Sequence, residues 1–250
     1  MTTPARPVSF VKDASGAPAV DLTKVREVSQ DLAKSADRAG LALSKRDLSG
    51  VRMQVVALVD YSGSMKADYA SGAVSTLLTR ALGFALQVDA DGKIPVIPFD
   101  GSVRPTFEVD QTNFSTAVDT IVATNGTMGS TNLAAALREL KKIVETSDLP
   151  VFAIIVTDGN PDDKAAATAE VIDLARYAAA LKFLAVREVP YLSELDDLDA
   201  SKRLVDNVDT KPEAGSGLNL LTCSDADFQD ALADELDTWF VAAKAAGIIQ

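Results

Sequence analysis

Length, composition and charge describe a globular chain and exclude several classes of function. The 250 residues are 47% hydrophobic and 24% charged, which suits the core of one large α/β domain. The formal net charge of −12 would repel nucleic-acid phosphates and anionic lipid, so neither is an expected partner. The chain has no histidine and one cysteine, Cys223, which excludes Ser-His-Asp and Cys-His catalysis, histidine-ligated zinc and an internal disulfide.

The N-terminal region differs from the rest of the chain. Residues 1–20 are rich in proline and small polar residues and predict a loose arm, and residues 21–46 have the periodicity of one amphipathic helix. We expect this helix to pack against the main body or a partner. The predicted division is an arm and helix at 1–48 and the main domain at 49–250. The arm has no apolar signal core and no run of about 18 apolar residues exists, so a cytoplasmic protein without a membrane span is expected.

Apolar runs and helical patterns alternate along the main domain. The uninterrupted runs at 55–59 and 151–156 are typical of strands that are buried on both faces of a parallel sheet. Asp100-Gly101 indicates a hairpin, which makes the strand at 103–109 an antiparallel edge strand. Further strands are expected at 94–99, 182–189 and 216–222, and helices at 67–87, 112–122, 133–146, 162–180 and 225–246. This pattern predicts a doubly wound α/β fold, with a mostly parallel six-stranded sheet, one antiparallel edge strand and helices on both faces.

The first buried strand ends abruptly in polar residues. Val59 is followed by Asp60, and then by Ser62 and Ser64 at alternate positions. Open α/β sheets bind their ligands at the carboxyl ends of strands, which is where this loop lies. One carboxylate and two hydroxyls are hard oxygen ligands suited to Mg²⁺ or Mn²⁺. On this stretch alone, a serine and glycine turn that caps the following helix explains the residues equally well.

Two later loops are expected to meet the first. Thr131 lies at the end of a loop of small polar residues before a helix, and Asp158 follows the buried strand at 151–156. If that strand lies beside the one at 55–59, the two strands define a topological switch point at which all three loops converge. The alternative role for Thr131 is that of a helix N-cap, which Ser130 could take instead.

The three loops together resemble a known family. A carboxylate and two serines, a distant threonine and an aspartate within Thr-Asp-Gly resemble the metal-ion-dependent adhesion site (MIDAS) of von Willebrand factor A (vWA) domains, here Asp60, Ser62, Ser64, Thr131 and Asp158. The resemblance covers roughly residues 50–245 and implies the Rossmann-like vWA fold. The turn at 98–100 and the acidic stretches at 195–198 and 205–207 are also similar to bacterial vWA proteins of the tellurium-resistance group.

The resemblance implies a function for these residues. Ser62 and Ser64 would bind the ion through their hydroxyls, Thr131 would join them when a ligand is present, and Asp60 and Asp158 would act directly or through water. The implied protein is a non-enzymatic module in which Mg²⁺, or Mn²⁺ or Ca²⁺, captures a Glu or Asp carboxylate of a partner protein, within a tellurium- or stress-resistance complex. The loop reads Gly129-Ser130-Thr131, where many vWA loops have another glycine, which leaves Ser130 as an alternative ligand.

Two other functions are open to the same fold. A Mg²⁺-dependent phosphatase-like hydrolase could use Asp60 as its nucleophile, but positions 62 and 64 are serines and no lysine or arginine directly follows the Asp158 motif to bind phosphate. Dinucleotide binding is disfavoured because no Gly-x-Gly-x-x-Gly follows the first strand. The sequence indicates no particular oligomeric state.

Overall fold

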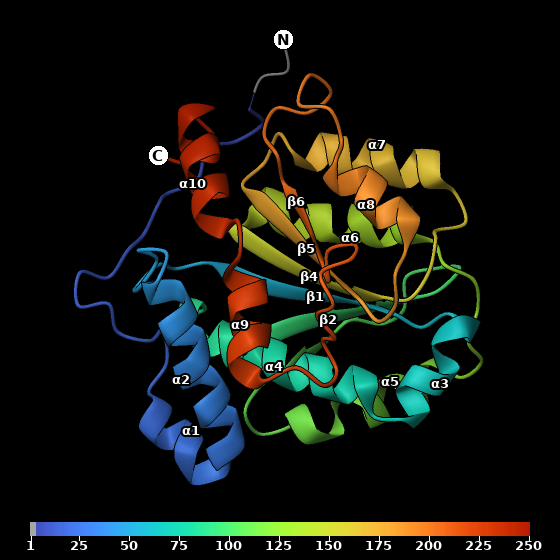
Figure 1. The fold of residues 1–250 in the computed structure, drawn as a ribbon, viewed down its shortest axis with the longest axis horizontal. Coiled ribbons are helices and arrows are strands. Elements are labelled where there is room, and N and C mark those ends of the chain that lie inside the picture. The colour runs from blue at the N-terminus through green and yellow to red at the C-terminus, as the bar shows by residue number, and fades with distance from the viewer. Residues whose placement is uncertain (1–3) are drawn as a thin grey trace.

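The apolar runs form the centre of the sheet. In the computed structural model, which describes residues 4–250, six strands pair in the order β3-β2-β1-β4-β5-β6 (Figure 1). The five parallel strands are β1 (Gln54–Asp60), β2 (Ile94–Phe99), β4 (Val151–Thr157), β5 (Ala179–Ala185) and β6 (Val208–Lys211). β3 (Phe107–Val109) pairs antiparallel with β2 at the edge. The predicted mostly parallel sheet with one antiparallel edge strand is confirmed.

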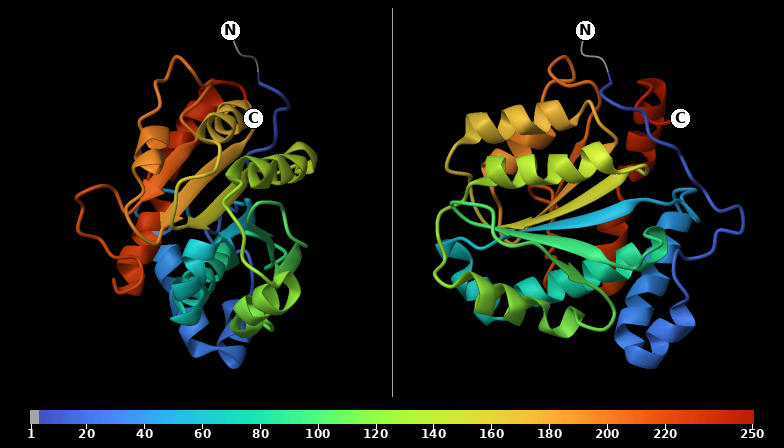
Figure 2. Two further views of the ribbon diagram at one scale, coloured as in Figure 1. Left: turned by 90° about the vertical axis from the view of Figure 1, so that its right-hand side faces the viewer. Right: turned by 180° about the vertical axis from the view of Figure 1, so that it is seen from behind.

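Alternate residues of the central strand face two separate cores. Val55, Ala57 and Val59 of β1 face one core, and Val56 and Leu58 face the other. The first core is covered by α4 (Ala73–Val88), α5 (Ala117–Asn125), α9 (Asp225–Ala233) and α10 (Leu236–Ala245). The second is covered by α6 (Leu133–Thr146), α7 (Lys164–Leu174) and α8 (Pro190–Asp196) (Figure 2). Because helices cover both faces, a ligand can approach the buried strands only at their ends.

The predicted N-terminal helix is two helices, α1 (Leu22–Val28) and α2 (Gln30–Ser44). Ser29 has an extended backbone, and its side chain accepts a hydrogen bond from the Leu32 backbone N–H, so a new helix begins there. α2 packs against α4 and α9 and contributes to the first core. The helix therefore lies against the main body, while the domain division at residue 48 stays a prediction.

Left-handed backbone divides two other predicted helices. Gly72, with φ of +81°, separates α3 (Lys66–Ala70) from α4, and Glu235, with φ of +57°, separates α9 from α10. The helix predicted at 112–122 begins as a 3₁₀ turn, η2 (Phe114–Thr116), and continues as α5. These differences move helix ends but leave the layers unchanged.

The last two strands of the sheet begin at earlier residues than predicted. α7 ends at Leu174 rather than 180, and β5 begins at Ala179 rather than 182, because the run of alanines there suits either element. β6 occupies 208–211, and the strand predicted at 216–222 is wrong. The sequence of β6 is polar, but its Asp209 and Lys211 are buried and form an ion pair at 3.1 Å. A hydropathy pattern does not show that charged residues are buried in this way.

The N-terminal arm is docked rather than loose. Val8 forms a parallel bridge with Ile249, and the Gln250 backbone N–H donates a 2.9 Å hydrogen bond to the Val8 carbonyl. Residues 1–3, the start of the predicted arm, lie outside the described residues. Within 4–250, no helix has the length and apolar character that crossing a membrane requires.

Candidate metal centre

The carboxyl end of β1 holds Asp60 at the rim of the sheet. Its carboxylate Oδ1 accepts a 2.8 Å hydrogen bond from the Ser62 backbone N–H, and Oδ2 accepts a 2.6 Å hydrogen bond from Thr157 Oγ1 at the end of β4. Asp60 is buried, and this burial raises its pKa, while the hydrogen bonds from Thr157 and Ser62 act in the opposite direction. The carboxylate is therefore held in one orientation, and a nearby cation would favour its charged form.

The two serines join the end of β1 to the end of β4. Ser62 Oγ and Ser64 Oγ lie 3.0 Å apart, and Ser64 Oγ donates a 2.8 Å hydrogen bond to Asp158 Oδ1. Ser62 precedes the 3₁₀ turn η1 (Gly63–Met65), but its side chain makes no capping hydrogen bond. The capping explanation for this stretch is therefore wrong, and the structure brings Asp60, Ser62, Ser64 and Asp158 together.

Thr131 lies in a third loop that packs beside the serine loop. The Gly63 backbone N–H donates a 2.8 Å hydrogen bond to the Gly129 carbonyl, two residues before Thr131. Asn132 caps α6, so the N-cap role considered for Thr131 and Ser130 is wrong. Among residues 4–250, the hydrogen bonds of Thr131 are made by its backbone, to Asp162, and its hydroxyl has no hydrogen-bond partner. The structure thus places Thr131 in the neighbouring loop with a free hydroxyl.

Two residues at this rim were missed by sequence analysis. Thr157 directly precedes Asp158 and could have been noticed as a hydroxyl at a strand end. Arg187 follows β5, and its Nη1 donates to Asp158 Oδ2 while its Nη2 lies 2.7 Å from Asp68 Oδ2 in α3. Its place after the strand next to β4 was the available indication, because the rim collects residues from the carboxyl ends of neighbouring strands.

The arrangement of oxygens fits a hard divalent cation. Asp60, Ser62, Ser64 and Asp158 offer carboxylate and hydroxyl oxygens, which Mg²⁺, Mn²⁺ and Ca²⁺ prefer. The contacts between the two hydroxyls, and between Ser64 and Asp158, turn these oxygens toward one another. Arg187 contacts the other oxygen of Asp158, so Oδ1 still faces Ser64. The residues present are chemically suited to the ion that the MIDAS resemblance implies.

Comparison with known proteins decides the family. The family vWA-TerF-like, described as a vWA found in the TerF C terminus, matches residues 52–249. This chain belongs to that family. The match confirms the predicted vWA resemblance and its tellurium-associated group, and vWA domains are in general protein-interaction modules.

Individual relatives of this vWA domain are distant. The uncharacterized protein YcbR of Bacillus subtilis (strain 168) is 26% identical over 216 residues, which is 84% of this chain and 86% of YcbR. The manganese-loaded TRAP protein of Plasmodium vivax aligns with a TM-score of 0.49 and 16% identity, over 74% of this chain and 73% of that chain. A von Willebrand factor type A structure from Catenulispora acidiphila has a TM-score of 0.46 and 16% identity, over 75% of this chain and 44% of that chain. YcbR therefore matches most of both chains, whereas the two structural likenesses are weak.

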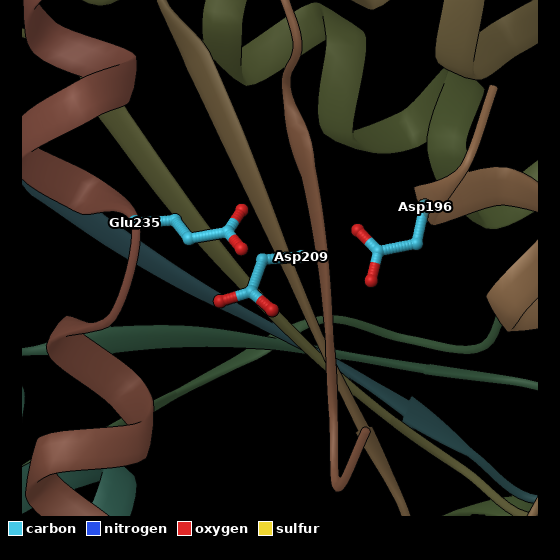
Figure 3. Close-up of side chains that lie close together, drawn as sticks. All are labelled: Asp196, Asp209 and Glu235. Atoms are coloured by element: carbon cyan, nitrogen blue, oxygen red, sulfur yellow. The ribbon is translucent and has the colours of Figure 1, made fainter. Parts of the chain in front are cut away.

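A second acidic cluster lies at the β6 edge of this vWA domain. Carboxylate oxygens of Asp196, Asp209 and Glu235 lie within 4.8 Å of one another (Figure 3). However, the ammonium groups of Lys182 and Lys211 both contact Asp209, the latter at 3.1 Å from Oδ1. Both lysines therefore already pair with the buried central carboxylate of Asp209, so ion pairs account for this cluster, whose Glu235 is exposed, without a metal ion.

Proposed function

We propose that this vWA domain captures an acidic residue of a partner protein through a divalent cation held by five side chains, Asp60, Ser62, Ser64, Thr131 and Asp158. Mg²⁺ is the expected ion, and Mn²⁺ or Ca²⁺ would use the same kind of oxygen ligand. The observation that carries the proposal is the hydrogen-bonded series that runs from the Asp60 carboxylate through the two serines to the Asp158 carboxylate.

Burial and exposure at the site favour capture of an external ligand. The side chains of Asp60 and Asp158 are buried at the strand ends, whereas Ser64 is exposed. An ion held by the buried carboxylates would keep coordination positions that face solvent, because Mg²⁺ retains several exchangeable waters. The carboxylate of a partner can replace one of these waters. The free hydroxyl of Thr131 is a further oxygen beside the serine loop.

The proposed role is binding and not catalysis. Both carboxylate oxygens of Asp60 accept hydrogen bonds from the protein, which orients the group as a buried ligand and leaves it poorly presented as a nucleophile. The phosphatase-like alternative also needs a second carboxylate beside Asp60, and serines occupy positions 62 and 64. Membership of the TerF-like family supports a role within a cytoplasmic tellurium- or stress-resistance complex, which is part of the proposal.

Titration calorimetry with Mg²⁺ and Mn²⁺ tests the ion site. Wild type should bind one ion, and Ser62→Ala/Ser64→Ala should bind none. Ser130→Ala is the matched control, because it removes a hydroxyl from the adjacent loop; it should bind like wild type if Thr131 is the ligand. Equal binding by wild type and the double variant would overturn the metal assignment.

Affinity capture then tests the partner. Proteins held by wild type should be lost both with chelator and with the Ser62→Ala/Ser64→Ala variant. A partner set that is the same in all three conditions would overturn ion-mediated capture. Turnover of a generic phosphate ester that disappears in Asp60→Asn would favour the hydrolase instead.

A further inference from the structure

Arg187 brings a permanent positive charge to the proposed ion site, and what it does there depends on the proposed function. One side of its guanidinium is anchored by Asp158 and Asp68, whose side chains are 1% and 12% exposed. The Arg187 side chain itself is 46% exposed. The guanidinium is thus fixed in the rim on one side and open to solvent on the other.

Formal charges show what Arg187 changes. Asp60, Asp68 and Asp158 bring three negative charges to the rim, so a divalent cation alone would leave one net negative charge there. A centre of that charge repels a carboxylate. With Arg187 the loaded centre is neutral, and an acidic partner no longer approaches a negative site. The positive charge of Arg187 is also needed because the whole chain carries a net charge of −12, which repels any acidic partner.

We propose that Arg187 is the specificity-determining residue of this site: it weakens binding of the cation and strengthens capture of the carboxylate. Both effects come from one charge, which repels the cation and attracts the carboxylate. Two of the guanidinium nitrogens contact Asp158 and Asp68, and the remaining N–H donors are available to a ligand. The partner that fits this site is an acidic segment in which neighbouring Asp or Glu side chains engage the ion and Arg187 together.

A merely structural role for Arg187 predicts a different pattern. If Arg187 only held Asp158 in place, its loss would misplace an ion ligand, and binding of cation and carboxylate would fall together. In addition, loss of Asp68 would then act in the same direction as loss of Arg187, because each holds the other. If the charge of Arg187 acts directly, its loss shifts the cation and carboxylate affinities in opposite directions, and loss of Asp68 has effects opposite to loss of Arg187.

The test measures two affinities in four variants of the full chain. Mn²⁺ binding is measured by electron paramagnetic resonance of the free ion, and binding of a capped tetraglutamate peptide by calorimetry at saturating Mn²⁺, with a tetraglutamine peptide as the ligand control. Arg187→Gln should bind Mn²⁺ at least about threefold more tightly and the acidic peptide at least about tenfold more weakly. Asp68→Asn, which removes a negative charge, should shift both affinities in the opposite directions.

Arg26→Gln is the matched control. Arg26 lies in α1, is 51% exposed and pairs with Asp37 at 2.9 Å, so this variant loses the same charge from a similarly exposed arginine of another element. It should match wild type in both affinities. Arg187→Lys keeps the charge but loses the forked donors, so its Mn²⁺ affinity should stay close to wild type. Together with Asp68→Asn it distinguishes the two roles if Arg187→Gln does not fold by circular dichroism.

The outcomes separate the two proposals. Weaker Mn²⁺ binding in Arg187→Gln, or shifts of the same sign in Arg187→Gln and Asp68→Asn, would overturn the role of Arg187 while leaving the ion site in place. The same shifts in Arg26→Gln would also overturn it, because they would reflect net charge alone. Absence of Mn²⁺ binding to wild type would instead overturn the proposed function, and the role of Arg187 with it.

Discussion

Ser64 Oγ donates its hydrogen bond to Asp158 Oδ1 across 94 residues of sequence. The two residues meet because β1 and β4 are parallel neighbours, with Val59 beside Val156, so the loops that follow them leave the sheet at the same edge. β2 lies on the other side of β1, and the chain reverses direction across the sheet between these neighbours. The candidate site is thus a consequence of topology: it occupies the switch point of a doubly wound sheet.

Ion binding should stabilise the wild-type fold measurably. A ligand that binds only the folded state at about one hundred times its dissociation constant adds about 2.7 kcal/mol, or about 5–11 °C in Tm for a chain of this size. Ser64→Ala should lose this shift, and without ion it should be about 1–3 kcal/mol less stable than wild type, because the buried Asp158 Oδ1 loses its donor. Calorimetric melting with and without Mg²⁺ checks both expectations. An equal Mg²⁺ shift in the variant would show that Ser64 is not a ligand.

Thr157→Val should destabilise the protein through Asp60. The Thr157 hydroxyl is the donor to the buried Asp60 Oδ2, and valine leaves that oxygen without a partner. An unsatisfied buried polar group costs about 1–3 kcal/mol, and more when it is charged. Thr120→Val is the control, because Thr120 is exposed and its hydroxyl donates to the Thr116 carbonyl one turn earlier. Urea unfolding should show a clear difference between the two variants, and equal midpoints would contradict the role of Thr157.

The sequence was sufficient for the parts of the structure that depend on long apolar patterns. The uninterrupted runs identified β1 and β4, and the periodicity at 133–146 matched α6. Such patterns predict secondary structure because a strand buried on both faces has a continuous apolar run, and a helix buried on one side has apolar residues at a helical period. The convergence of Asp60 and Asp158 followed from the same two strands.

The features that sequence reasoning missed depend on side chains that meet only in the folded protein. The position of β6 was predicted wrongly because its Asp209 is buried in ion pairs with Lys182 and Lys211. In a sequence, such charged residues are interpreted as surface residues. Arg187 was missed because its role depends on its ion pair with Asp158, which follows a different strand. Ser29 begins a helix through a local hydrogen bond that a periodic pattern does not show.

Asp89 should make stability depend on pH. Its Oδ2 accepts a 2.7 Å hydrogen bond from the Val55 backbone N–H, and burial is the main cause that raises its pKa from 3.8 to about 7. Because the folded pKa lies above the unfolded one, the folded state holds the proton more tightly. This contribution to the free energy of unfolding is complete below about pH 4 and is lost as the pH rises through about 7.

Asp89→Asn cannot ionise and can still accept the hydrogen bond from Val55. Its stability relative to wild type should therefore increase by about 2–3 kcal/mol between pH 5 and pH 8, since the folded carboxyl loses its proton only near pH 7. Urea unfolding of both proteins at the two pH values measures this difference. A difference that is the same at pH 5 and pH 8 would mean that Asp89 does not titrate in this range.

Gly83→Ala should loosen the N-terminal helices from the vWA core. A Cβ at Gly83 would lie 2.6 Å from Ser35 Oγ and 3.2 Å from the Ser35 carbonyl carbon, so α2 would have to move away from α4. Overpacking of this kind costs about 1–3 kcal/mol, which exceeds the gain of about 1 kcal/mol in helix propensity. At Gly40, by contrast, a Cβ would meet only the end of the Gln87 side chain, at 3.0 Å, so Gly40→Ala should cost less.

The shape of the unfolding transition would then bear on the predicted division at residue 48. Ser35 of α2 belongs to the same buried layer as α4 and α9, and its hydroxyl accepts a 3.0 Å hydrogen bond from Gln229. If residues 1–48 were an independent unit, Gly83→Ala would produce an early separate transition in urea, because only the contact with α2 would be lost. We expect one cooperative transition with a lower midpoint, since α2 covers apolar residues of the main core that cannot stay buried without it.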